Sequence, residues 1–348
     1  MTIDRLGHRA LGACAAATLV ACSQSPAVPN TASLVQRVAT SSARADAQGC
    51  PLKRCIIVGS LSGYQGKPLS SVLFFARDAN GNVSPAGEIQ GSKTMLALPA
   101  GLAMDSQHNI YVANYNSITV YAAGAEGNVA PTRAISGVKT LLKTPAGIAI
   151  DSRGKLYVAD NQDNRILVYA RDANGDSAPI RVIRGNHTQL YAPWGLAFDS
   201  QSNLYVADSE PNNGWITVYA PGADGNTAPV RTIKGSATKL QGPMGLAVDA
   251  SGYVYVVNST SVDWEVGVFA PDANDNQAPV SYFSGGYGAF GIGVGDRGIY
   301  VTSVGYDDEP FVATFSPGSS DKYGQRKVLR KVEGNKTKLI WPEGIIVR

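Results

Sequence analysis

The chain has 348 residues, of which 44% are hydrophobic and 16% are charged, and its formal net charge is +3. This composition is that of an ordinary globular protein, and it excludes a disordered chain, a collagen-like chain and a polytopic membrane protein. The 30 Lys and Arg residues form no basic run against the 27 Asp and Glu residues, which argues against a nucleic-acid partner. Glycine and proline, with 38 and 19 residues, predict many turns between short strands.

The first predicted element is a short apolar segment near the N-terminus. A basic stretch ending at Arg9 precedes the uncharged residues 10–21, a run too short for a permanent transmembrane helix and typical of a signal peptide. The sequence Leu-Val-Ala-Cys that ends at Cys22 resembles the lipobox of bacterial lipoproteins. Because Ser23 follows, the resemblance implies cleavage before Cys22 and a lipid anchor on Cys22 in the bacterial outer membrane. A cleaved signal of a soluble secreted protein is the alternative.

The segment after the signal peptide divides the chain further. Residues 22–49 are rich in Ser, Ala, Gln and Pro and predict a flexible tether, whereas 50–348 is expected to fold. Once the signal peptide is removed and Cys22 is acylated, the remaining thiols are Cys50 and Cys55. An oxidising compartment favours a disulfide between them, which would close a small loop, and a redox or metal pair is the alternative.

From residue 99 onward the chain repeats the phrase Pro-x-Gly-Leu-Ala-x-Asp, with Ile for Leu in the second copy. The full copies and one shortened copy begin at Pro99, Pro145, Pro193, Pro243 and Pro342. A period of this length, 46 to 50 residues between successive full copies, is typical of propellers and arrays. Each unit holds four short β-like runs between Asp-, Asn- and Gly-rich turns, and the Asp of the phrase is predicted to hold the turn after it. The third run, such as 166–170, is apolar at nearly every position, which indicates a sheet covered on both faces.

The two ends of the repetitive region predict a closed ring. The chain finishes at 342–348 with a first strand that has no successors, and the region begins at 55–59 and 72–76 with a second and a third strand that lack a first. Six third strands can be counted. We therefore predict an all-β, six-bladed β-propeller of four-stranded antiparallel blades, closed by pairing of the C-terminal strand with the N-terminal blade.

One stretch of the second full repeat points to a family. Residues 154–166, Gly-x-Leu-Tyr-Val-Ala-Asp-x-x-x-Asn-Arg-Ile, closely resemble the NHL repeat. The resemblance implies a six-bladed propeller over 55–348. Relatives with this architecture include amidating lyases, gluconolactonases, strictosidine-synthase-like enzymes and protein- or RNA-binding modules, so the fold leaves the function open.

The first candidate site is the residue between Pro and Gly of each phrase, which should face the axial channel. These positions are Ala100, Ala146, Trp194, Met244 and Glu343, and Phe290 takes the same place at the degenerate junction of the fifth and sixth units, where no proline precedes it. A concave mouth with apolar walls and few polar groups is typical of a site for a small ligand. Side chains that only plug the channel are the alternative.

The second candidate site is the end of each second strand, on the same face. The six positions are Ser60, Asn114, Asp160, Asp208, Asn258 and Ser303. Asp and Asn can accept backbone N–H bonds there and hold a tight loop. Their oxygens also suit Ca²⁺ or Mg²⁺, and a resemblance to gluconolactonases implies a divalent metal near this face, for which the candidate ligands are Asn114, Asp160, Asp208 and Asn258. The early glutamate ligand of those relatives is missing.

Loops on this face are longest in the fourth to sixth units, where they are acidic and aromatic. In the same region the linker pattern Gly-x-x-Thr-x-Leu-x-x-Pro is lost, at residues 285–291. We predict that a ligand or partner contacts Trp215, Trp264, Tyr306, Asp307 and Asp308, besides the bulky channel residues. Sequence drift in an unconstrained blade is the alternative.

Taken together, the sequence predicts a monomeric, lipid-anchored propeller at the outer membrane. It is expected to bind a small molecule or a protein at its channel face without catalysis, to touch the membrane through the lipid alone and to bind no nucleic acid. No Gly-x-Ser-x-Gly or His-Glu-x-x-His motif occurs. The alternatives are a divalent-metal-dependent lactonase or lyase of the gluconolactonase-like kind and a structural scaffold of the cell envelope.

Overall fold

The computed structural model describes residues 55–61, 70–210, 213–259, 264–305, 309–317 and 326–348, without the side chains of Ser259 and Trp264. The chain divides into two units, Met1–Ser41 and Ser42–Arg348, and every described residue lies in the second. The expected signal peptide, tether, Cys22 and Cys50 fall outside the described residues. The three-part division of the chain, the lipid anchor and the Cys50–Cys55 disulfide therefore stay predictions. The described residues contain no helix of the length and apolarity needed to cross a bilayer.

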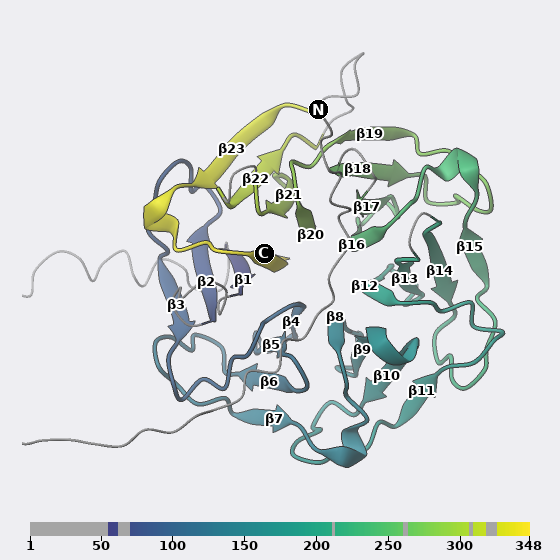
Figure 1. Ribbon diagram of the computed structural model, residues 1–348, viewed down its shortest axis with the longest axis horizontal. Helices are drawn as coiled ribbons and strands as arrows, with labels where there is room; N and C mark the ends of the chain where they lie inside the picture. The colour runs from purple at the N-terminus through teal and green to yellow at the C-terminus, as the bar shows by residue number, and fades with distance from the viewer. Residues whose placement is uncertain (1–54, 62–69, 211–212, 260–263, 306–308, 318–325) are drawn as a thin grey trace, which may run out of the picture. The chain divides into compact units, whose positions relative to one another are not determined.

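The described strands form six four-stranded antiparallel sheets, which are the blades of a propeller around one axis (Figure 1). The first blade has the strand order β24 (Pro342–Val347), β1 (Cys55–Ser60), β2 (Ser71–Ala76) and β3 (Gly87–Gln90). The second blade contains β4 (Leu102–Met104), β5 (Ile110–Ala113), β6 (Ile118–Tyr121) and β7 (Arg133–Ile135). The third blade contains β8 (Pro145–Ile150), β9 (Leu156–Asp160), β10 (Arg165–Tyr169) and β11 (Arg181–Ile183).

The remaining three blades follow in chain order. The fourth contains β12 (Pro193–Phe198), β13 (Leu204–Asp208), β14 (Trp215–Tyr219) and β15 (Arg231–Ile233). The fifth contains β16 (Pro243–Val248), β17 (Val254–Ser259), β18 (Trp264–Phe269) and β19 (Ser281–Ser284). The sixth contains β20 (Ala289–Gly295), β21 (Gly298–Ser303), β22 (Phe311–Phe315) and β23 (Val328–Glu333). Short 3₁₀ turns lie at η2 (Val138–Thr140), η3 (Asn161–Asp163), η4 (Ser236–Thr238) and η6 (Asn335–Thr337).

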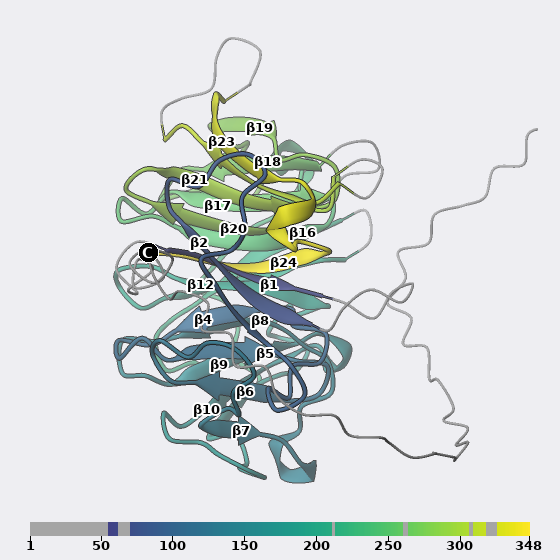
Figure 2. The same cartoon turned by 90° about the vertical axis from the view of Figure 1, so that its left-hand side faces the viewer.

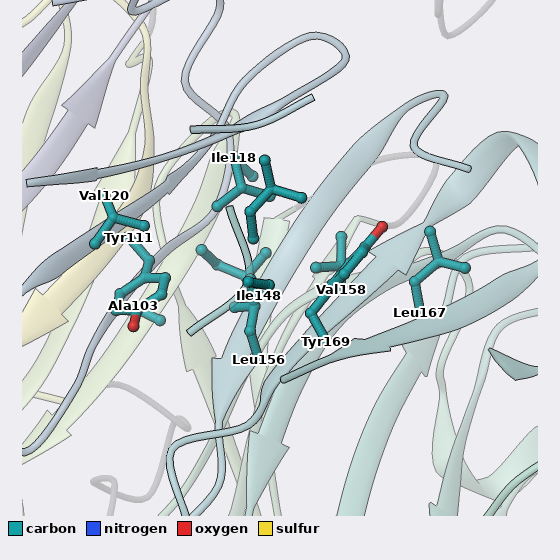
Figure 3. Packing of buried hydrophobic residues seen from close by; sticks show 12 residues of the cluster. Ala103, Tyr111, Ile118, Val120, Ile148, Leu156, Val158, Leu167 and Tyr169 are labelled. Atoms are coloured by element: carbon teal, nitrogen blue, oxygen red, sulfur yellow. The ribbon is translucent and has the colours of Figure 1, made fainter. Parts of the chain in front are cut away.

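Burial follows the order of strands within a blade. Every residue of β9 and β10 is buried, because neighbouring blades cover both faces of the sheet, whereas the outermost strand β11 is buried at Ile183 alone. Figure 3 shows the packing between the second and third blades, where Tyr111 and Ile118 face Ile148 and Leu156. The predicted two-sided burial of the inner strands is confirmed.

The ring closes as predicted. β24 pairs antiparallel with β1, with Ile56 opposite Val347 and Val58 opposite Ile345, and Figure 2 shows the two strands side by side. At the end of this ladder the Arg348 N–H donates a hydrogen bond of 3.1 Å to the Cys55 carbonyl. The chain ends therefore complete one blade, and no sheet is left with an uncovered inner edge.

Five of the six linkers from a fourth strand to the next first strand are attached to the following blade by a hydrogen bond of the same kind. The Lys139 N–H, just after Gly137, donates to Asp176 Oδ1 of the third blade at 2.7 Å. Gly137 has a φ of 127°, and a Cβ there would lie 2.4 Å from the same oxygen, so the position requires glycine. Equivalent bonds from linker N–H groups reach Asn128, Asn226, Asn276 and Asn82. The recurring Gly of the linker pattern thus serves blade-to-blade contact.

The register of the strands separates two faces of the propeller. Pro145 lies opposite Asp160 at one end of the third blade, and Ile150 lies opposite Leu156 at the other. We call the first end, where linkers and second-to-third-strand loops lie, the linker face, and the opposite end the turn face. On the turn face the Asp151 carboxylate accepts bonds from the N–H groups of Arg153 and Lys155, at 2.9 and 2.8 Å, which confirms the predicted role of the repeated Asp.

Candidate functional site

The six first strands surround the axis and leave a cavity of about 100 Å³ toward the linker face. Its wall includes the whole first predicted ring, Ala100, Ala146, Trp194, Met244, Phe290 and Glu343. The strands approach closely because glycine follows each of these positions: a Cβ on Gly147 would lie 2.1 Å from the Trp194 carbonyl oxygen. The structure therefore brings together the bulky residues that the repeat placed at the channel mouth. Trp194, Met244 and Phe290 each keep part of their surface exposed.

Among the described residues that line this cavity, Glu343 has the single ionisable side chain. No described residue forms a hydrogen bond or ion pair with its carboxylate, and burial among apolar neighbours raises its pKa to about 8. Its backbone carbonyl, by contrast, accepts a bond of 3.0 Å from the Thr302 hydroxyl. The main chain of Glu343 is thus fixed while its acidic group faces the channel without a partner.

The second predicted ring holds the linkers. The Oδ1 atoms of Asn114, Asp160, Asp208 and Asn258 accept the backbone N–H of the residue 17 positions earlier. These four bonds measure 2.9, 3.1, 2.9 and 2.9 Å. Ser60 Oγ does the same for Ile340 at 3.0 Å, across the closing blade. Of the two interpretations of this ring, the loop-holding one is therefore visible in the structure.

Two aspartates of this ring have different surroundings. Asp160 is fully buried and its Oδ2 lies 2.7 Å from Arg165 Nη2. In the fourth blade Trp215 occupies the place of Arg165, opposite Asp208, which is also fully buried. Thr217 donates to Asp208 Oδ2 at 3.1 Å, and burial without an ion pair raises the pKa of Asp208 well above its usual value.

The four predicted metal ligands were tested against these contacts. Each already uses an oxygen to hold its own linker, and Asp160 is neutralised by Arg165. In the part of the chain that the structure describes, no three His, Cys, Asp or Glu side chains lie together as ligands of one ion. The described contacts thus show these four side chains holding their linkers, and the Ca²⁺ or Mg²⁺ site stays a prediction.

None of the predicted loop residues whose side chains are described lines the channel cavity. Trp215 is only 5% exposed; its Nε1–H donates to the Gln189 carbonyl at 3.0 Å, and Lys234 Nζ lies 3.7 Å from the ring centroid. Its ring has little surface left for a ligand. Trp264 begins β18 without a described side chain, and Tyr306, Asp307 and Asp308 lie outside the described residues. Their predicted contacts stay predictions.

The linker face carries a set of exposed apolar side chains that the sequence analysis missed. We call this set the apolar rim: Met95, Leu98, Tyr115, Leu141, Tyr191, Tyr287 and Trp341. Trp341 is 39% and Tyr191 46% exposed, and the Trp341 ring lies 5.9 Å from that of Phe290, which joins the rim to the channel. The missed signal was that four of the linkers place a large exposed apolar residue within four positions of their proline, while Tyr287 lies in the linker without a proline and Tyr115 follows Asn114.

A second, larger cavity lies on the turn face. It measures about 500 Å³ and is lined by the turn-face ends of β4, β20 and β24, including Asp105, His108 and Arg348. Asp105 Oδ1 is engaged there by the N–H groups of Gln107 and Asn109, both at 2.9 Å. None of the predicted site residues lines this cavity.

Comparison with known proteins agrees with this architecture. A protein from Bacteroides fragilis described as a candidate 6-phosphogluconolactonase is 18% identical, with a TM-score of 0.53 and coverage of 84% of this chain and 83% of that one. A Bacteroides caccae protein of unknown function and a Lactobacillus plantarum protein are 12% and 14% identical, with TM-scores of 0.54 and 0.51. Each of these alignments covers 84% of this chain and 98% of the other. No curated protein sequence matches. Residues 142–169 match the family model of the NHL repeat, and the chain is a six-bladed β-propeller that carries this repeat.

Proposed function

We propose that this propeller is a binding protein that engages its ligand or partner over the channel mouth on the linker face and catalyses no reaction. The observation that carries the proposal is the apolar rim, which lies on the same face as the mouth of a channel lined by Trp194, Met244 and Phe290 and contacts it through Trp341. Exposed apolar side chains on the face where a concave mouth opens are typical of an interaction site. Acid–base catalysis commonly uses two or more positioned polar groups, whereas Glu343 is the one ionisable side chain of this cavity.

The direction of the first blade supports the same face. Cys55 begins β1 beside Arg348 on the turn face, and Ser60 ends it on the linker face. The expected tether and its lipid anchor on Cys22 would therefore join the propeller on the turn face.

Site-specific cross-linking in cells that produce the full chain tests the proposal. A photo-reactive residue, p-benzoylphenylalanine, replaces Tyr191 in the apolar rim or, as the matched control, Tyr253 on the turn face, which is 39% exposed. We expect a discrete adduct from position 191 alone, and a lower yield when Trp341→Ala is added. Equal adducts from both positions, or none from position 191, would refute the assignment of this face. Adducts unaffected by Trp341→Ala would instead favour a passive scaffold.

The metal-dependent lactonase or lyase predicted as an alternative is tested separately. Its argument from the structure is Asp208, a buried carboxylate without an ion pair. Hydrolysis of an aldonolactone that requires added Ca²⁺ and is abolished by Asp208→Ala would replace the binding proposal with an enzymatic one. We expect no turnover with or without the metal.

A further inference from the structure

The channel cavity is small, whereas the surface around it is broad. Its volume of about 100 Å³ lies below the ~300–1,000 Å³ of pockets that enclose a whole small ligand. The apolar rim around it is contributed by linkers and loops of at least five blades. A central pocket that admits one side chain, surrounded by apolar and aromatic residues that exclude water, is the usual anatomy of a protein–protein interface.

The acidic group in the central pocket indicates which kind of side chain would bind there. The Glu343 carboxylate has no partner among the described residues and is the only ionisable group in the wall. A cationic group would supply the missing countercharge. Trp194 and Phe290 in the same wall present aromatic rings, which also favour a nearby cation.

We infer that the partner of the linker face is a protein that inserts a lysine side chain into the axial channel, where the ammonium group pairs with the Glu343 carboxylate. The inference rests on the proposed function and names its partner class. Lysine fits better than arginine, because a narrow aliphatic stem with a compact ammonium can enter a cavity lined by small and apolar residues. The planar guanidinium seeks two oxygens side by side and more room.

The affinity of the channel for a cation should depend on pH, because the Glu343 carboxyl must ionise to pair with it. Without a partner, burial holds the Glu343 pKa near 8, so the carboxyl is mostly protonated at neutral pH. An ammonium, with a pKa of about 10.4, remains charged up to pH 9. Binding of the cation should therefore strengthen as pH rises from 6 to 9, while binding of a neutral analogue should not change.

The first experiment uses n-butylammonium, which reproduces the end of a lysine side chain, and 1-butanol as its uncharged analogue. Calorimetric titration of the full chain is expected to give a dissociation constant on the order of 1 mM for the amine and about ten-fold weaker binding of the alcohol. Glu343→Gln should weaken the amine about ten-fold and leave the alcohol unchanged. Glu126→Gln, at an exposed position, is the matched control and should change neither. Equal binding of amine and alcohol, or of the amine by both variants, would overturn the inference.

The second experiment separates this inference from the proposed function. The cross-linked adduct from position 191 is measured in Glu343→Gln and Glu126→Gln chains, whose folding is checked by circular dichroism. Loss of the adduct in Glu343→Gln alone supports a lysine in the channel. An adduct that persists in Glu343→Gln means that the face is right and the lysine inference wrong. If n-butylammonium binds at micromolar concentration and no adduct forms, the ligand is a free small amine and the inference of a protein partner fails.

Discussion

The equivalent aspartates of the third and fourth blades are expected to respond in opposite directions to the same substitution. In Asp160→Asn the buried guanidinium of Arg165, 6% exposed, loses its Asp160 contact and keeps Asp163 at 2.8 Å. Breaking a buried ion pair costs several kcal/mol, so with one carboxylate retained we expect a loss of about 2–3 kcal/mol in unfolding free energy. Asp208 has no such pair, and its replacement removes an ionisable group that burial disfavours in its charged form.

The hydrogen bonds of Asp208 can be kept by asparagine. Oδ1 would still accept the Tyr191 N–H, and the new amide could donate to the Thr217 hydroxyl. The second blade already contains this arrangement, since Asn114 Nδ2 donates to Thr119 Oγ1 at 3.0 Å. We therefore expect Asp208→Asn to stabilise the protein by about 1–2 kcal/mol at pH 7.

The gain in unfolding free energy from Asp208→Asn should increase as pH rises. Because the folded-state pKa of Asp208 is raised, the native wild-type protein holds a proton that the unfolded chain releases above pH ~4. Wild-type stability consequently falls as pH rises through the folded-state pKa, whereas the asparagine variant lacks this loss. Urea unfolding at pH 4.5, 7 and 9, followed by circular dichroism, should show a difference that grows with pH. A destabilised Asp208→Asn at pH 7, or an Asp160→Asn of unchanged stability, would refute this account.

Three further predictions follow from the closure, the axis and the channel. Deletion of 342–348 removes β24 and bares the β1 edge, so thermal melting should lose its cooperative transition; a sharp melt at the wild-type temperature would contradict the closure. Gly147→Ala places a Cβ 2.1 Å from the Trp194 carbonyl and should cost about 3 kcal/mol in urea unfolding, against no more than ~1 kcal/mol for Ser152→Ala in an exposed turn. Glu343→Gln should make the decline in stability between pH 4.5 and 8 shallower than in the wild type, since the raised pKa keeps the native Glu343 carboxyl protonated over that range and the contribution of Asp208 remains. Parallel pH curves for the two proteins would show that the pKa of Glu343 is not raised.

The repeat made the fold predictable. The Pro-x-Gly phrase recurs with nearly constant spacing, and strands buried on both sides leave an apolar signature that needs no tertiary knowledge, as Ile166 to Tyr169 show. Closure followed from the unmatched strands at the two ends. The channel residues were predictable for the same reason, because equivalent positions of a ring must converge on its axis.

The remaining site residues depend on contacts that no single repeat encodes. A carboxylate or amide oxygen can accept an N–H bond or bind a cation, and the sequence pattern is the same in both cases. The hydrogen bonds from the linker N–H groups to Asn114 and Asp160 become visible only in the structure. Trp215 looked like an exposed loop residue, but the Gln189 carbonyl and Lys234 enclose it. The apolar rim has no period within a blade: Tyr191 and Trp341 occupy different positions of their linkers and share only a face.

Glu343 differs from the other five residues of its ring because its side chain is acidic and loses hydration in the channel. Alanine, tryptophan, methionine and phenylalanine at the equivalent positions satisfy the packing of the axis, so the fold itself has no need of an acid there. Asp160 shows how this propeller stabilises a buried carboxylate for structural purposes, with an arginine at 2.7 Å and two backbone N–H groups. Glu343 has neither, and desolvation in the channel raises its pKa. The Glu343 carboxyl bonds to no described residue, so an incoming cation would supply its missing partner. For this reason we propose the linker-face end of the channel, rather than the larger cavity on the turn face, as the binding site.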